Sequence, residues 1–178
     1  MNLKMITVIL VVICSSLKAQ DYTFDHLGIE QGMSQNQVNA ICQDKYGFMW
    51  FGTWDGLNRY DGYEFKTFKH RAFDTSSLSS NFITELLSDS RGNLWIGTNG
   101  GGINLYNEKG QSFRGIDFNP FSENSLSNNS INDIIEDSKG RIWVGTNFGL
   151  NMFIFDEQNK LNVKTFFFKS YTKQQNFN

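Results

Sequence analysis

The fold of this chain is decided by one stretch, Asp44-Lys45-Tyr46-Gly47-Phe48-Met49-Trp50-Phe51-Gly52-Thr53, which recurs twice with the same framework. The later copies are Asp89-Ser90-Arg91-Gly92-Asn93-Leu94-Trp95-Ile96-Gly97-Thr98 and Asp137-Ser138-Lys139-Gly140-Arg141-Ile142-Trp143-Val144-Gly145-Thr146. The tryptophans lie 45 and 48 residues apart, and each follows a serine by 16 residues, at Ser34, Ser79 and Ser127. Self-similarity at so long a period is the signature of a repeat architecture.

Each copy predicts a unit of four strands. In the first copy we expect strands at residues 38–43, 48–53, 57–60 and 63–69. The Asp-x-x-Gly between the first two strands suits a type I turn, in which Asp bonds the backbone and Gly takes a positive φ. Asp61-Gly62 is a hairpin signal before the fourth strand. Longer turns replace it in the later copies, at residues 107–110 and 156–160.

The first strands carry apolar residues on both faces, as in Ile83, Leu86 and Leu87. Such strands need cover on both faces, which sheets stacked around an axis provide. A repeat of 45 to 48 residues also fits a propeller blade. The sequence therefore predicts an all-β, partial β-propeller with repeats at 34–78, 79–126 and 127–178. No stretch shows the 3.6-residue apolar period of a helix.

Composition agrees with short strands and tight turns. Aromatic residues make up 15% of the chain, and it contains 16 Gly but 1 Pro. The net charge is -2 without a basic run, so the electrostatic footprint of a nucleic-acid-binding protein is missing. We therefore expect no nucleic acid among the partners.

The first 20 residues have a different character, with Lys4 preceding an apolar run from Ile6 to Ile13. They read as a secretory signal peptide cleaved near Ala19 or Gln20, which predicts export to the periplasm. The apolar run is shorter than the about 20 residues that span a bilayer. Removing the signal would leave Cys42 as the only thiol, so no intrachain disulfide is expected.

Both ends suggest an incomplete propeller. Residues 21–33 are expected to hold a closing strand and lead-in, because 22–27 resemble the predicted fourth strand. Residues 166–178 are likewise expected to form a fourth strand and linker. A closed ring usually has about 4 to 8 blades, so we expect a truncated or partial chain whose open edges seek partners.

The segments 47–62 and 92–98 resemble the two-component regulator propeller repeat, and 27–34 resemble the opening of that family. The resemblance covers residues 22–178. It implies the periplasmic sensor region of a hybrid two-component system, with an oligosaccharide as ligand. The implied partners are the remaining blades and kinase modules of a full-length protein, with a homodimer as a further arrangement. No kinase motif occurs in this chain, so it is expected not to be an enzyme.

The repeated residues are interpreted as structural. The tryptophans occupy a fixed mid-strand position typical of core residues, and the aspartates and glycines are expected in turns. Cys42 aligns with Leu87 and Ile135 and is expected to be a small buried hydrophobe. His26 and His70 lack companions at ligand spacing, so neither a metal site nor a cofactor is expected. The structural set is Asp44, Gly47, Trp50, Gly52, Asp89, Gly92, Trp95, Gly97, Asp137, Gly140, Trp143 and Gly145.

Residues that differ between copies are the candidates for ligand binding. In a propeller, the loops between second and third strands share one face with the loops entering the first strands, and loops on a rigid scaffold commonly bind ligands. Their amide, aromatic and charged side chains suit a hydroxyl-rich ligand. The alternative is that the asparagines only satisfy turn backbones. The candidates are Asn36, Trp54, Asp55, Arg59, Asn81, Asn99, Asn129, Asn147 and Phe148.

Two other functions stay open. A secreted propeller glycosidase or lyase would need paired acids or a basic cluster in the central pocket. A structural propeller that joins surface proteins, or the remnant of a broken gene, would need neither.

Overall fold

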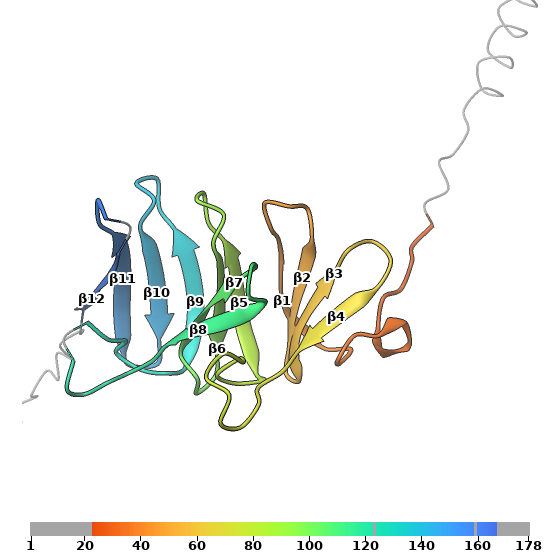
Figure 1. Ribbon diagram of the computed structural model, residues 1–178, viewed down its shortest axis with the longest axis horizontal. Coiled ribbons are helices and arrows are strands. Elements are labelled where there is room, and N and C mark those ends of the chain that lie inside the picture. The colour runs from red at the N-terminus through yellow and green to blue at the C-terminus, as the bar shows by residue number, and fades with distance from the viewer. Residues whose placement is uncertain (1–22, 123, 159, 167–178) are drawn as a thin grey trace, which may run out of the picture.

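The computed structural model describes residues 23–122, 124–158 and 160–166, which form three four-stranded antiparallel sheets side by side (Figure 1). Each sheet is a meander whose strands follow chain order. Blade A consists of β1 (Val38–Gln43), β2 (Met49–Thr53), β3 (Gly56–Tyr60) and β4 (Phe65–Phe68). Blade B consists of β5 (Ile83–Ser88), β6 (Leu94–Thr98), β7 (Ile103–Asn107) and β8 (Ser112–Ile116). Blade C consists of β9 (Ile131–Glu136), β10 (Ile142–Thr146), β11 (Gly149–Phe155) and β12 (Leu161–Phe166). The predicted all-β, partial β-propeller is confirmed.

Each blade begins with the same hairpin turn. The Oδ1 atom of Asp44 accepts hydrogen bonds from the backbone N–H groups of Tyr46 and Phe48, at 2.9 and 3.0 Å. Gly47 has a φ of 92°, a conformation that glycine adopts without a steric penalty. The other carboxylate oxygen, Oδ2, accepts from Nε1 of Trp50 at 2.7 Å. Since the corresponding bonds recur at 2.8 Å in blades B and C, the turn fixes the tryptophan of every blade.

The tryptophans pack between neighbouring blades. Trp50 contacts Tyr106 of blade B, and Trp95 contacts Phe153 of blade C, with ring centroids 4.9 and 5.4 Å apart. Both indoles are fully buried in the core between the blades. Trp143 is only half-buried and stacks on Phe166 of its own sheet.

The expectation that every first strand is covered on both faces is wrong for the outer two blades. Ile41 of β1 is 57% exposed and Ile135 of β9 is 53% exposed, whereas Leu86 of β5 is buried. Blade B has a neighbour on each side, so both faces of β5 are covered. Among the described residues, blades A and C each have a neighbouring sheet on one face only.

A buried polar network ties the opening serine of each repeat to its third strand. Nδ2 of Asn58 donates to Oγ of Ser34 at 2.8 Å, and Oδ1 of Asn58 accepts from the backbone N–H of Ser34 at 2.9 Å. The pairs Asn104–Ser79 and Asn151–Ser127 make the same two bonds. Because buried polar groups are costly when unpaired, these bonds hold the chain where it enters each first strand.

The predictions for the two ends are corrected by the structure. Residues 23–27 form no strand, because a strand needs a partner for its backbone groups and none of the described strands pairs with this segment. The fourth strand of blade C is Leu161–Phe166, earlier than the predicted 166–178. Residues 167–178 and the predicted signal peptide at 1–20 lie outside the described residues. Within the described ranges, no helix is long and apolar enough to cross a membrane.

The turn of blade C gives the protein a testable acid sensitivity. The Trp143 indole, and then the Arg141 and Lys139 groups, donate hydrogen bonds that hold the pKa of Asp137 well below its usual range. A lowered folded-state pKa adds stability above the unfolded value of about 3.9, and this stability is lost as the pH falls through the folded value. We expect Asp137→Asn to lower the urea midpoint at pH 7 and to flatten its decline between about pH 4 and 2.

Urea unfolding followed by circular dichroism at a series of pH values measures this effect. Asp117→Asn is the matched control, because the Asp117 carboxylate accepts no hydrogen bond from any described residue. An acid decline that is equally steep in Asp137→Asn and in the unmodified protein would contradict the prediction.

Candidate ligand-binding loop face

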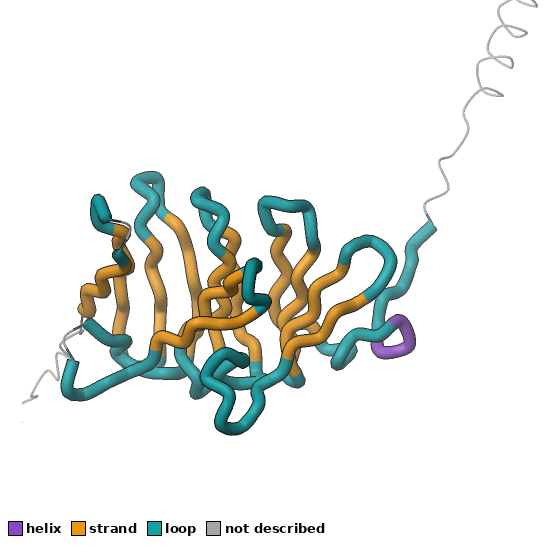
Figure 2. The backbone as a smooth tube through the Cα atoms, in the orientation of Figure 1, coloured by secondary structure: helices purple, strands orange, loops and turns teal. Residues whose placement is uncertain are grey.

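The candidate loops gather at one end of the three blades, at the lower edge in Figure 2. We call this end the loop face. It consists of the turns at 53–56, 98–103 and 146–149 and the loops that enter β1, β5 and β9, at 34–37, 79–82 and 127–130. The grouping follows from the meander, because alternate connections of antiparallel strands lie at the same end of a sheet.

Neighbouring blades are joined across the loop face. The backbone N–H of Gly56 in blade A donates to the carbonyl of Asn81 before β5, and Gly102 donates to Asn129 in the same way, both at 2.8 Å. The Trp54 ring lies 5.2 Å from that of Phe82, between centroids. The loops at 34–37 and 146–149 join through the bonds from Trp54 N–H to Gln35 and from Asn147 N–H to Ser130, so the six loops are connected.

Three of the predicted asparagines already hold the backbone. The Oδ1 atoms of Asn36, Asn81 and Asn129 accept from the N–H groups of Ile29, His70 and Phe118, at 2.9, 2.6 and 2.6 Å. Their side-chain oxygens therefore fix the segments that lead into the first strands. The Nδ2 donors of the three residues make no hydrogen bond within the described part of the chain.

The aromatic candidates are exposed on this face. Trp54 is 48% exposed, and its backbone N–H is held by Oε1 of Gln35 at 3.2 Å. Phe148 is 71% exposed at the corresponding turn of blade C. Both rings are thus presented to solvent by backbone that is itself anchored.

The polar candidates differ in how they are held. Asp55 forms an exposed ion pair with Lys69, with Nζ and Oδ2 2.7 Å apart. Oδ1 of Asn99 accepts from the Ser130 hydroxyl at 3.0 Å. Asn147 is exposed, and its backbone N–H donates to the carbonyl of Ser130 at 3.2 Å. Asn99 therefore belongs to a contact between blades B and C, whereas the Asn147 side chain is presented to solvent.

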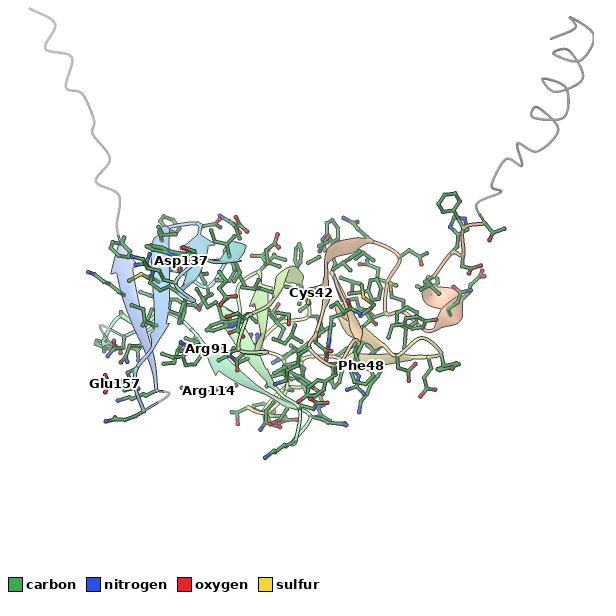
Figure 3. The ribbon with its side chains drawn as sticks, turned by 90° about the horizontal axis from the view of Figure 1, so that it is seen from above. Cys42, Phe48, Arg91, Arg114, Asp137 and Glu157 are labelled. Atoms are coloured by element: carbon green, nitrogen blue, oxygen red, sulfur yellow. The ribbon has the colours of Figure 1, made fainter. Side chains whose placement is uncertain are left out.

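Arg59 does not join the other candidates. It lies opposite Trp50 in the β2–β3 ladder, and its guanidinium carbon is 4.5 Å from the centroid of the Phe48 ring. Phe48 flanks the β1–β2 turn, at the end of the blades opposite the loop face. Figure 3 looks onto that opposite end, where Phe48 and Asp137 are labelled. Arg59 therefore contributes to packing there.

The Cys42 thiol is a poor nucleophile. It is half-buried against the core between blades A and B. Burial, and to a lesser degree the Asp44 charge, raise the pKa of Cys42 to about 12. The thiol is the less reactive, protonated form at neutral pH, which agrees with its interpretation as a small hydrophobe.

The described residues offer no group of three or more His, Cys, Asp and Glu side chains placed to hold a metal ion. The residues that sequence reasoning missed are those that support the loops. Asn58, Asn104 and Asn151 follow the tryptophans by eight or nine residues, and each Asp precedes its Trp by six. The constant Asp–Trp spacing and the nearly constant Trp–Asn spacing were the available signals for these hydrogen bonds.

Three segments match the family model of the two component regulator propeller, at residues 32–55, 77–100 and 125–148. Each segment runs from the entry of a first strand through the turn after the second strand, so it includes the loop face of its blade. The chain is also 44% identical over 66 residues to Histidine kinase P4 of Formosa agariphila, across 36% of this chain and 5% of that protein.

Among solved structures, the chain is similar to the extracellular domain of the hybrid two-component system BT3049 from Bacteroides thetaiotaomicron. The TM-score is 0.69 at 35% identity, across 78% of this chain and 19% of that domain. For the extracellular domain of BT4673 from the same organism, the TM-score is 0.49 at 20% identity, across 85% of this chain and 34% of that one. The chain therefore spans a small part of the length of each of these relatives.

Proposed function

Because this chain carries three repeats of the two-component regulator propeller family, we propose that it is a ligand-sensing segment of a two-component sensor that works in the periplasm. Its ligand is an oligosaccharide, and it performs no catalysis of its own. The kinase modules that would act on the signal belong to other parts of such a sensor. The observation that carries the proposal is the loop face, where anchored backbone presents Trp54, Phe148 and free amide groups to solvent.

The chemistry of the loop face suits a sugar. An apolar aromatic ring packs against the C–H face of a sugar ring, and a few well-placed polar groups then fix its orientation. Trp54 supplies such a ring, supported from behind by Phe82. The amide of Asn147 supplies both a donor and an acceptor for hydroxyl groups.

Contacts between blades give a route from binding to signalling. Trp54 belongs to blade A, whereas Phe82 and Asn81 belong to the segment that enters blade B. A ligand on Trp54 therefore touches the junction of two blades. If two arrangements of this junction differ in affinity for the ligand, binding shifts their populations, which is what a sensor requires.

One pair of acids favours a second candidate, a glycosidase or lyase. Glu85 and Asp133 occupy the same repeat position on the adjacent first strands β5 and β9. Burial, and then the Asp133 charge, raise the pKa of Glu85 above its usual value, as in a general acid. Release of products from the oligosaccharides tested below, abolished by Glu85→Gln, would favour catalysis over sensing.

Binding by the loop face is tested with an array of neutral and acidic oligosaccharides, followed by calorimetric titration of those that bind. We expect Trp54→Ala to weaken binding by roughly tenfold or more, because exposed aromatic anchors dominate such sites. Tyr63→Ala is the matched control: Tyr63 is 94% exposed but lies in the β3–β4 turn at the opposite end of blade A. The proposal is overturned if no oligosaccharide binds, or if Trp54→Ala binds as tightly as the control.

A further inference from the structure

A second recess lies away from the loop-face rings, between the outer strands of blades A and B. We call it the outer groove; its volume is about 470 Å³. It is bounded by Lys66 and Lys69 at the strand β4, by Arg71 in the connection to blade B, and by Gln111 before β8. Sites for small organic ligands commonly occupy about 300–1,000 Å³, so the groove has room for a molecule of this kind.

The charged residues that line the outer groove are all cationic. Three of its lining residues are cationic, and none of the described lining residues is acidic. Lys66 donates to the side-chain oxygen of Gln111 across the blade boundary and has no carboxylate partner among the described residues. Its charge is therefore not neutralised by an ion pair.

The other two cations are paired with carboxylates outside the lining. Lys69 pairs with Asp55 at 2.7 Å, and Arg71 pairs with Asp74 at 2.9 Å. The side chains of Lys69 and Asp55 are 45% and 48% exposed, and those of Arg71 and Asp74 are 72% and 33% exposed. Exposed ion pairs contribute little, so an anion in the groove can compete for both cations.

The repeat shows that the fold does not require a cation at the positions of Lys69 and Arg71. In blade B the connection after the fourth strand has the same backbone bonds: the Ser77 hydroxyl donates to the carbonyl of Arg71, and the Ser125 hydroxyl to that of Asn119. His70 and Phe118 likewise donate to the equivalent Asn81 and Asn129. The equivalents of Lys66, Lys69 and Arg71 are Arg114, Asp117 and Asn119. A cation at the Lys66 position recurs in blade B, whereas the cations at Lys69 and Arg71 are specific to the groove between blades A and B.

We propose that the outer groove is a binding site for an oxyanion, either free or as a carboxylate on a molecule of sugar size. Arg71 can pair with two oxygen atoms of such a group at once, and Lys66 and Lys69, from the same edge of blade A, add point charges. Neither Trp54 nor Phe148 lines the groove, although Lys69 pairs with Asp55 of the loop face. The proposal goes beyond the proposed function, and its test is separate.

The test is calorimetric titration of the protein at low ionic strength with sodium sulfate, with sodium galacturonate, and with galactose as the neutral counterpart. We expect saturable binding of galacturonate and no binding of galactose. If the site also recognises a free anion, sulfate competes with galacturonate. Sulfate alone binding would assign the site to a free inorganic anion. Galacturonate alone would assign it to a carboxylate on a sugar.

Two variants install the residues that blade B already carries: Arg71→Asn alone, and Lys69→Asp combined with Arg71→Asn. We expect roughly tenfold weaker anion binding for the first and a larger loss for the second, with unchanged circular dichroism. Arg114→Gln in blade B is the matched control and keeps full affinity.

Binding of neither anion overturns the proposal, and so does equal weakening by Arg114→Gln, which would indicate general attraction of anions to the surface. Full affinity in both variants overturns it as well. Trp54→Ala leaves anion binding unchanged if the two sites are independent. Failure of the outer groove is thereby distinguished from failure of the loop face.

Discussion

Replacing Trp95 by alanine is expected to lower the free energy of unfolding by about 3–5 kcal/mol. The Trp95 side chain is fully buried, and its ring lies 5.4 Å from Phe153 and 6.2 Å from Phe155 of blade C. Truncation removes these contacts and leaves a cavity between two blades. It also removes the indole N–H bonded to Asp89 at 2.8 Å, which leaves a buried carboxylate with fewer donors.

Urea unfolding followed by far-ultraviolet circular dichroism measures the loss. The matched control is Trp143→Ala at the same repeat position, where the ring is half-buried and packs on Phe166 of its own sheet. We expect a smaller loss there, of about 1–2 kcal/mol, since less apolar surface leaves water on folding. Equal losses would mean that packing between blades B and C is not what makes Trp95 important.

Replacing Gly52 by alanine is expected to destabilise the protein by about 1–3 kcal/mol through overpacking. A Cβ atom at this position would lie 2.5 Å from Cγ2 and 3.0 Å from Cβ of Ile83. Ile83 is fully buried on β5, and its Cβ atom is fixed to the backbone, so a rotamer change cannot relieve both contacts. Blade B would have to move away from blade A.

The repeat provides the control for this substitution too. Gly145 is the equivalent residue of blade C, and the nearest atom to a Cβ there is Cβ of Asp133, at 3.9 Å. Gly145→Ala is expected to change stability by less than about 0.5 kcal/mol, measured by the same urea titration. A large loss in Gly145→Ala would show that the glycine is needed for its backbone conformation and not for the approach of the next blade.

Sequence reasoning succeeded where the fold repeats its own pattern. The first strand at 38–43 was predicted with its observed bounds, because three copies of the Asp-x-x-Gly turn fix the register of the hairpins. The errors lie at the ends. Residues 23–27 and the strand Leu161–Phe166 depend on which backbone lies beside them, and strand propensity does not carry that information.

Part of the candidate site was predictable from the sequence, and part of it was not. The loops were grouped correctly because the meander alone places alternate turns together. Arg59 was wrongly grouped with these loops. It lies three residues after Gly56 on an extended strand that rises about 3.3 Å per residue, so it is well away from the loop face. The role of the Asn81 oxygen was also beyond prediction, because its donor at His70 lies 11 residues earlier and meets it only in the folded chain.

The hydrogen bonds from Gly56 to Asn81 and from Gly102 to Asn129 make each blade's geometry depend on the next one. Interactions then run between nearest neighbours along a single direction, as in a linear array of coupled units. In such an array a disturbance at one junction decays with the number of junctions it crosses. A bound ligand therefore changes the structure of the two blades that it bridges the most. The change in any other blade is smaller, and it decreases with the number of blades in between.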